Sequence, residues 1–123
     1  MRADSLDDST LDELLEFAGK GGEELVRDLV GLFFAEIPAR LDNIRSGVAL
    51  GHPELVIRAA HAMRGGAGNL GAVRTVVLCS QLEQRGRDGE LAGAGALVTE
   101  LEEEVARLRT LLQARVERRP VRS

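Results

Sequence analysis

Residues 25–48, LVRDLVGLFFAEIPARLDNIRSGV, decide the fold class. Apolar residues recur in this stretch at intervals of three and four, the period of an amphipathic helix. They are Leu25, Leu29, Leu32, Phe33, Ile37, Leu41, Ile44 and Val48. Pro38 lies inside the pattern, so we expect a kink or a helix boundary near Glu36. The stretch predicts a long helix, and no part of the chain shows the strict alternation of a half-buried strand.

Helical periodicity continues on both sides of this stretch. A short helix is expected over about residues 10–17, begun by a capping box of Thr10 and Glu13 and ended by the glycines of residues 19–22. Its apolar face is Leu11, Leu14 and Leu15. A further helix is expected to start at Pro53, because proline suits the first helical turn. Its buried face is predicted to be Leu55, Ala59, Met63, Ala67 and Leu70.

Two more helices complete the pattern. One is predicted from about Ala72 to Arg85, with residues 86–89 as the turn after it. Its apolar positions are Val76, Cys79 and Leu82. The last helix begins weakly over residues 91–95, where two glycines lower helix stability. It then becomes strongly periodic through Leu97, Leu101, Val105, Leu108 and Leu112.

Long helices joined by short turns favour antiparallel neighbours. We therefore predict an all-α fold, an antiparallel up-and-down four-helix bundle covered by the short N-terminal helix. A single domain is expected over residues 1–123, with its core in about residues 10–115. The basic tail, residues 116–123, is expected to fray.

Composition excludes several classes of function. A chain of 123 residues is too short for a multidomain enzyme. A net charge of −4 without tryptophan or tyrosine gives neither the positive field nor the stacking surfaces of nucleic-acid binding. No apolar run approaches the roughly 18–20 residues that cross a bilayer, so we expect a cytoplasmic protein without membrane insertion. The single cysteine, Cys79, excludes an internal disulfide and a cysteine-rich metal site, and we expect it to be buried and inert.

The two histidines differ in their surroundings. His52 precedes Pro53 in a turn, where a solvated or capping role is expected. His61 falls opposite the apolar face of its helix on a wheel of about 100° per residue, so its side chain is predicted to stand outward. Its neighbours one turn away are Ile57, Arg58, Arg64 and Gly65.

Chemistry at His61 is suggested by the residues on its side of the helix. Glycine in an exposed helical face lowers helix stability by about 0.5–1 kcal/mol relative to alanine. The presence of Gly65 and Gly68 on the His61 side therefore calls for a structural or functional explanation. Either another backbone approaches closely here, or Gly65 and Gly66 mark a helix end, and spacing alone does not separate the two. An exposed imidazole is largely neutral at pH 7 and keeps a lone pair for nucleophilic attack. With the Arg64 cation beside it to receive an anion, a phosphoryl acceptor is the favoured interpretation.

The next helix brings a carboxylate to the same height. If the two helices form a hairpin turning near Gly71, His61 lies ten residues before the turn and Glu83 twelve after it. At about 1.5 Å per residue, the two side chains are nearly level. Glu83 either accepts a hydrogen bond from one ring nitrogen and fixes the tautomer, or is an ordinary surface carboxylate.

Three segments resemble the histidine-containing phosphotransfer (HPt) family. They are AHAMRG at residues 60–65, GNLGA at 68–72 and CSQLE at 79–83. The resemblance extends over nearly the whole chain and implies a phosphohistidine carrier of two-component signalling. In that role His61 would take a phosphoryl group from an aspartyl phosphate on one receiver domain and pass it to another. The resemblance gives supporting roles to Arg64, Gly65, Gly68 and Glu83, and it implies a partner surface that includes Ile57 and Arg58.

The resemblance also implies which molecule supplies the chemistry. The receiver would contribute an acidic pocket and Mg²⁺, while this chain would bind no cofactor or metal and would not be an enzyme by itself. Its partners would be response-regulator receiver domains or a hybrid histidine kinase, and a monomer is the family-like expectation. The chain departs from the family in having Arg64 in place of the usual lysine and His52-Pro53 in place of the usual acidic residue. Arg64 keeps the charge and changes the geometry of phosphate contact.

Two rival functions share the bundle. A helical adaptor would dock on a receiver or kinase without phosphotransfer, and a phosphoacceptor module of a larger histidine kinase would take its phosphoryl group from ATP through a separate domain. Residues 66–71 also match the G-x-G-x-x-G dinucleotide fingerprint. That fingerprint requires a preceding strand, and a helical pattern precedes these residues, so dinucleotide binding is excluded.

Overall fold

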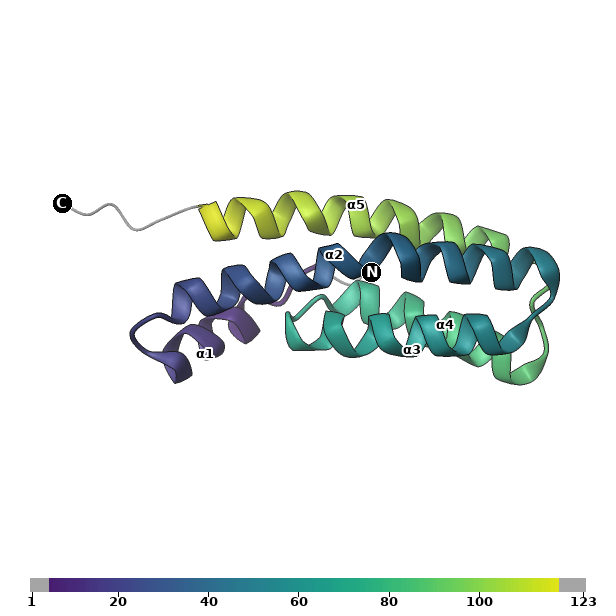
Figure 1. Cartoon of the computed structure of the whole chain (residues 1–123), viewed down its shortest axis with the longest axis horizontal. Coiled ribbons are helices and arrows are strands. Elements are labelled where there is room, and N and C mark those ends of the chain that lie inside the picture. Colours follow the sequence, from purple (N-terminus) through teal and green to yellow (C-terminus); the bar gives the residue numbers. More distant parts are fainter. Residues whose placement is uncertain (1–4, 118–123) are drawn as a thin grey trace.

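The structure, a computed structural model, describes residues 5–117, and every regular element in that range is a helix. The helices are α1 (Asp8–Ala18), α2 (Gly22–Leu50), α3 (Pro53–Asn69), α4 (Val73–Asp88) and α5 (Gly95–Glu117). Helix α2 packs against both α3 and α5, and α4 packs against the same two helices, so the four form a closed ring (Figure 1). The predicted all-α, up-and-down four-helix bundle is confirmed.

The short helix α1 covers one end of the bundle, alongside the first half of α2 (Figure 1). The predicted capping box is wrong: Asp7 caps α1, and its carboxylate accepts hydrogen bonds from the backbone and the hydroxyl of Ser9. Asp7 is held at the N-cap position by a tertiary contact, because its backbone N–H donates a hydrogen bond to the carbonyl of Gly71 at 2.7 Å. At the other side, Arg115 of α5 pairs with Asp8 at 2.7 Å and with Asp12.

Helix α2 is continuous through Pro38, so the alternative of a helix boundary near Glu36 is wrong. Proline removes one backbone hydrogen bond from a helix interior, and packing must compensate for that loss. Here Ile37 and Leu41 on either side of the proline are both buried. The bundle therefore holds the helix together across the missing N–H.

The buried face of α2 differs from the predicted stripe. Leu25 and Leu32 are 41% and 63% exposed, whereas Val26, Val30 and Phe34 are buried. The first half of α2 carries two adjacent apolar arcs, and periodicity does not reveal which one faces the ring of neighbours. In α3 the shift is smaller, with Val56 and Ala60 added to the buried set and Leu55 half-buried.

Helix α4 extends beyond its predicted end. Gly86, Arg87 and Asp88 are helical, so the expected turn over residues 86–89 is wrong and the chain turns only at Gly89. Gly86 is buried, and a Cβ there would lie 2.8 Å from Cγ1 of Ile57. This glycine therefore serves close packing of α4 on α3 rather than a turn.

The C-terminal helix also runs further than predicted. Val116 and Glu117 still belong to α5, and Val116 is partly buried against the hydrophobic core. The expected fraying of the tail stays a prediction, and residues 118–123 lie outside the described residues. Across residues 5–117, no helix is both long enough and apolar enough to span a membrane.

Candidate functional site

His61 stands outward from the middle of α3, with 63% of its side chain exposed. Helix α3 continues through Gly65 and Gly66 to Asn69, so these glycines do not mark a helix end. A Cβ on Gly65 would meet no atom within 4 Å. The helix-end alternative is therefore wrong, and the structure leaves open space over Gly65, one turn beyond the imidazole. Close approach of a partner's backbone at this ledge stays a prediction.

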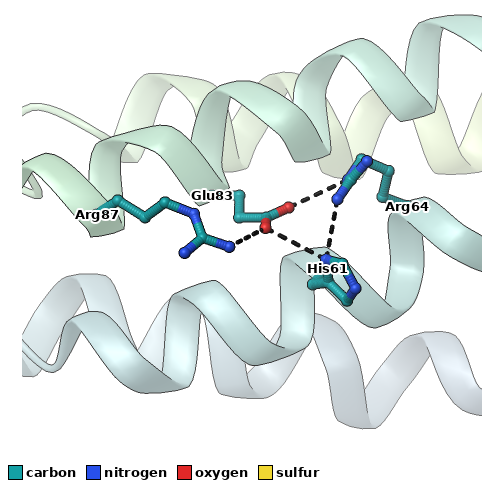
Figure 2. Close-up of polar contacts among 4 residues, drawn as sticks. All are labelled: His61, Arg64, Glu83 and Arg87. Atoms are coloured by element: carbon teal, nitrogen blue, oxygen red, sulfur yellow. Dashed lines mark hydrogen bonds and ion pairs between the residues drawn. The ribbon is translucent and has the colours of Figure 1, made fainter.

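Glu83 reaches His61 from α4, as Figure 2 shows. Its Oε2 lies 3.2 Å from Nδ1 of His61, and its Oε1 accepts a hydrogen bond from Nε of Arg64 at 3.1 Å. Only 8% of the Glu83 side chain is exposed. A carboxylate buried to this extent and paired in this way is not an ordinary surface group.

A second arginine, Arg87, completes the cluster. Its Nη2 donates to Oε2 of Glu83 at 2.6 Å, so the two oxygens of the carboxylate are held by different arginines (Figure 2). Arg87 was not among the predicted site residues, because the glycines on either side of it predicted a turn over residues 86–89. The signal was present in the spacing, since residues four apart on a helix are neighbours.

The charges around Glu83 keep it ionised. Burial raises the pKa of the Glu83 carboxyl, but hydrogen bonds from Arg87 and His61, with the positive charge of Arg64, outweigh burial and hold that pKa below its ordinary value. The carboxylate is thus a permanent acceptor at neutral pH.

The Nδ1 atom of His61 faces two competing partners. Besides Glu83, Nη2 of Arg64 lies 2.9 Å away. Toward Glu83 the nitrogen must donate a proton, whereas toward Arg64 it must accept one, and a single tautomer satisfies only one of them. No described residue hydrogen-bonds to Nε2, which points away from both partners in Figure 2.

The other predicted site residues lie around this cluster in different ways. Gly68 faces α4, where a Cβ would lie 4.0 Å from Cγ2 of Val76. Ile57 is half-buried and packs beside Gly86, so only part of it is available to a partner. Arg58 is 83% exposed and pairs with Glu54 at 3.7 Å, away from the Glu83 cluster.

A shallow groove that the sequence did not predict lies between α2 and α3, and its lining includes Ala62, the residue after His61. Its lining includes Leu29, Leu32 and Phe33 of α2, and Ala62 and Gly66 of α3. Leu32, one of the residues that carry the helical period of α2, is an exposed apolar residue at this groove. The exposed Leu32 of α2 therefore lines the same groove as Ala62, which follows His61 in the chain.

Other candidate residues show no chemistry of their own. His52 occupies the N-cap position of α3, is exposed, and makes no capping hydrogen bond with its side chain. Cys79 is buried, and burial raises its pKa to about 12. Within residues 5–117, no group of three or more His, Cys, Asp or Glu side chains is arranged to hold a metal ion.

Comparison with known proteins agrees with this geometry. The sequence model of the family described as the Hpt domain matches residues 28–111, which include His61 and the whole of α3 and α4. The chain belongs to the Hpt domain family. A solved structure, histidine-containing phosphotransfer protein B (HptB) from Pseudomonas aeruginosa PAO1, is similar at a TM-score of 0.79 and 30% sequence identity. The similarity covers 96% of this chain and 99% of that one. No curated protein gives a significant match.

Family membership sets the general role of the chain. As an Hpt domain it is a phosphotransfer carrier of two-component signalling, and Hpt proteins are phosphocarriers rather than conventional enzymes. Domains of this family act with receiver domains and kinases.

Proposed function

We propose that this Hpt domain carries a phosphoryl group on Nε2 of His61 and relays it between the aspartates of receiver domains. The observation that carries the proposal is the asymmetry of the imidazole. Its Nδ1 faces the buried carboxylate of Glu83 at 3.2 Å, while Nε2 points away from every described partner. In the tautomer that donates its Nδ1 proton to Glu83, the imidazole presents the Nε2 lone pair outward.

The transfer step follows from that arrangement. The Nε2 lone pair of neutral His61 forms the N–P bond while the O–P bond of the receiver's aspartyl phosphate breaks, and the electron pair returns to the aspartate carboxylate. The ring keeps its Nδ1 proton and gains positive charge. Glu83 accepts a hydrogen bond from Nδ1–H and stabilises that charge, so its carboxylate orients the ring before transfer and compensates it afterwards.

Arg64 supplies the cation for the transferred group. Its side chain is 37% exposed and lies one turn beyond His61, so the guanidinium can swing from Nδ1 to the phosphoryl oxygens. Its fork geometry suits an anion with several oxygens and explains how arginine serves where the family usually has lysine. After the phosphoryl group leaves, the Arg64 guanidinium would return to its contact with Nδ1.

The receiver would dock on the face around His61. Gly65 leaves room for its active site to reach the imidazole, and the groove lined by Leu32 and Phe33 offers apolar contact beside it. Mg²⁺ and the acidic pocket would come from the receiver, as in the general pattern of phosphoryl transfer, in which metal ions neutralise the developing charge.

The test is transfer from receiver domains charged with acetyl phosphate, followed by intact-mass measurement at neutral pH. Wild-type protein should gain one acid-labile phosphoryl group, and His61→Gln should gain none while its far-ultraviolet circular dichroism stays helical. His52→Gln is the matched control, because it removes the other exposed histidine and should take label like the wild type. Partner binding and pathway output that survive His61→Gln would show an adaptor instead. Label obtained only from ATP and a kinase domain would show a kinase module.

A further inference from the structure

We propose that Arg87 is a positioning residue for phosphotransfer: it holds Oε2 of Glu83 against Nδ1 of His61 and thereby selects the tautomer with Nε2 unprotonated. This inference rests on the proposed function, in which Nε2 is the phosphoryl acceptor. Arg87 lies in the last turn of α4 and does not touch the imidazole, so it acts through the carboxylate.

The contacts of Glu83 divide between two arginines. Arg64 donates to Oε1 at 3.1 Å, and Arg87 donates to Oε2 at 2.6 Å. The oxygen held by Arg87 is the one that faces Nδ1 of His61. Arg87 thus fixes the rotation of the carboxylate that places an acceptor beside the ring.

Arg64 favours the opposite tautomer of His61, with the proton on Nε2. Its Nη2 lies 2.9 Å from Nδ1, and a hydrogen bond donated there requires the lone pair on Nδ1 and the proton on Nε2. A ring in that state cannot attack phosphorus. Without Arg87, the Glu83 carboxylate is free to turn both oxygens toward Arg64, since arginine and carboxylate favour a two-bond pair. Nδ1 would then accept a hydrogen bond from Arg64 alone, which favours the tautomer with the proton on Nε2.

Arg87 differs from the other arginines that pair four residues along a helix. In the pairs Glu36–Arg40 and Glu54–Arg58 both partners are open to solvent, where such ion pairs contribute little. Arg87 instead reaches from a 55% exposed position to a carboxylate that is 8% exposed. Its place on the helix depends on Gly86, which lets the last turn of α4 pack against α3. The pair therefore orders a buried acceptor rather than the helix surface.

The experiment compares Arg87→Gln and Arg87→Lys with the wild type. The first readout is the ¹⁵N shifts of the His61 ring in protein alone, which identify the protonated nitrogen. The second is the initial rate of phosphoryl uptake from a charged receiver. Arg45→Gln is the matched control, because Arg45 is similarly exposed and holds two carboxylates, Asp42 and Glu102, at the α2–α5 side of the bundle.

Arg87→Gln should move the ring proton toward Nε2 and slow uptake about tenfold, the effect of losing one hydrogen bond from a partly exposed arginine to a charged acceptor. Arg87→Lys should restore both readouts, and Arg45→Gln should change neither. An unchanged tautomer in Arg87→Gln overturns the inference, as does uptake at the wild-type rate. Failure of the wild type to take label would refute the proposed function instead, and the ring shifts would still test the positioning role.

Discussion

Gly65→Ala should make the protein more stable and a poorer carrier. Gly65 is a helical glycine in the interior of α3, and an added Cβ meets no atom within 4 Å. Alanine there reduces the freedom of the unfolded chain at no steric cost, so the free energy of unfolding should rise by about 0.5–1 kcal/mol. For a chain of 123 residues this corresponds to a Tm increase of about 2–4 °C.

The same methyl group should hinder the partner. In our proposal the receiver's active site approaches this chain most closely beside His61. The receiver would then fill the space over Gly65, which is empty in the chain alone. A methylene-sized excess in a close-packed contact costs about 1–3 kcal/mol, so transfer should slow roughly tenfold or more.

Denaturant unfolding and phosphoryl uptake, measured on the same preparation, test both halves. Gly31→Ala is the matched control, because Gly31 is an exposed helical glycine in α2 with no atom within 4 Å of its added Cβ. It lies outside the groove lining, so it should stabilise by a similar amount and transfer at the wild-type rate. If Gly65→Ala transfers as fast as Gly31→Ala, the close approach at this ledge is wrong. If Gly65→Ala unfolds at a lower denaturant concentration than the wild type, the conclusion that a Cβ at residue 65 meets no steric obstacle is wrong.

Two further predictions concern stability. Gly71→Ala should cost about 2–3 kcal/mol, because the residue has a φ of +75° and its Cβ would lie 2.7 Å from the carbonyl oxygen of Asp7. Gly51→Ala, at a φ of +71° in open space, should cost only about 1 kcal/mol, and equal losses in a denaturant titration would refute a steric contribution at Gly71. Because the pKa of Glu83 in the folded protein is held below its ordinary value of 4.5, the stability that its ionised form contributes should be complete above that pH and lost as pH falls below it. Glu83→Gln should flatten the stability profile in that acid range, and parallel profiles for the two proteins would contradict the argument.

Helix periodicity predicted the bundle and the outward direction of His61 because both follow from which side of a helix must be buried. The same reasoning failed for α2, where two apolar arcs lie side by side. Leu32 and Phe33 are adjacent in the sequence and equally apolar, yet only Phe33 is buried. Burial here depends on how α3 and α5 flank the helix, which is tertiary information. Because of that ambiguity, the sequence did not predict the groove between α2 and α3 that Leu32 lines.

A different ambiguity hid Arg87. Glycine is favoured in turns and in close helix contacts, and the sequence GRDG at residues 86–89 contains one glycine of each kind. Gly89 turns the chain with a φ of +70°, whereas Gly86 is helical and packs against Ile57. Only the position of α3 separates the two roles. Placing the turn three residues too early removed Arg87 from the face that carries Glu83.

The completed cluster changes the electrostatic character of the site. The net charge of the chain is −4, which by itself would repel both a phosphoryl group and the acidic pocket expected of a receiver. Beside His61, however, two guanidinium groups surround one carboxylate, and their sum of +2 and −1 leaves +1. Because Glu83 is buried while both arginines reach solvent, an approaching partner meets the positive groups first. In the proposed function, the Glu83 carboxylate that orients the imidazole is thus screened from the phosphoryl group that the imidazole would accept, and without Arg87 the local sum would be zero.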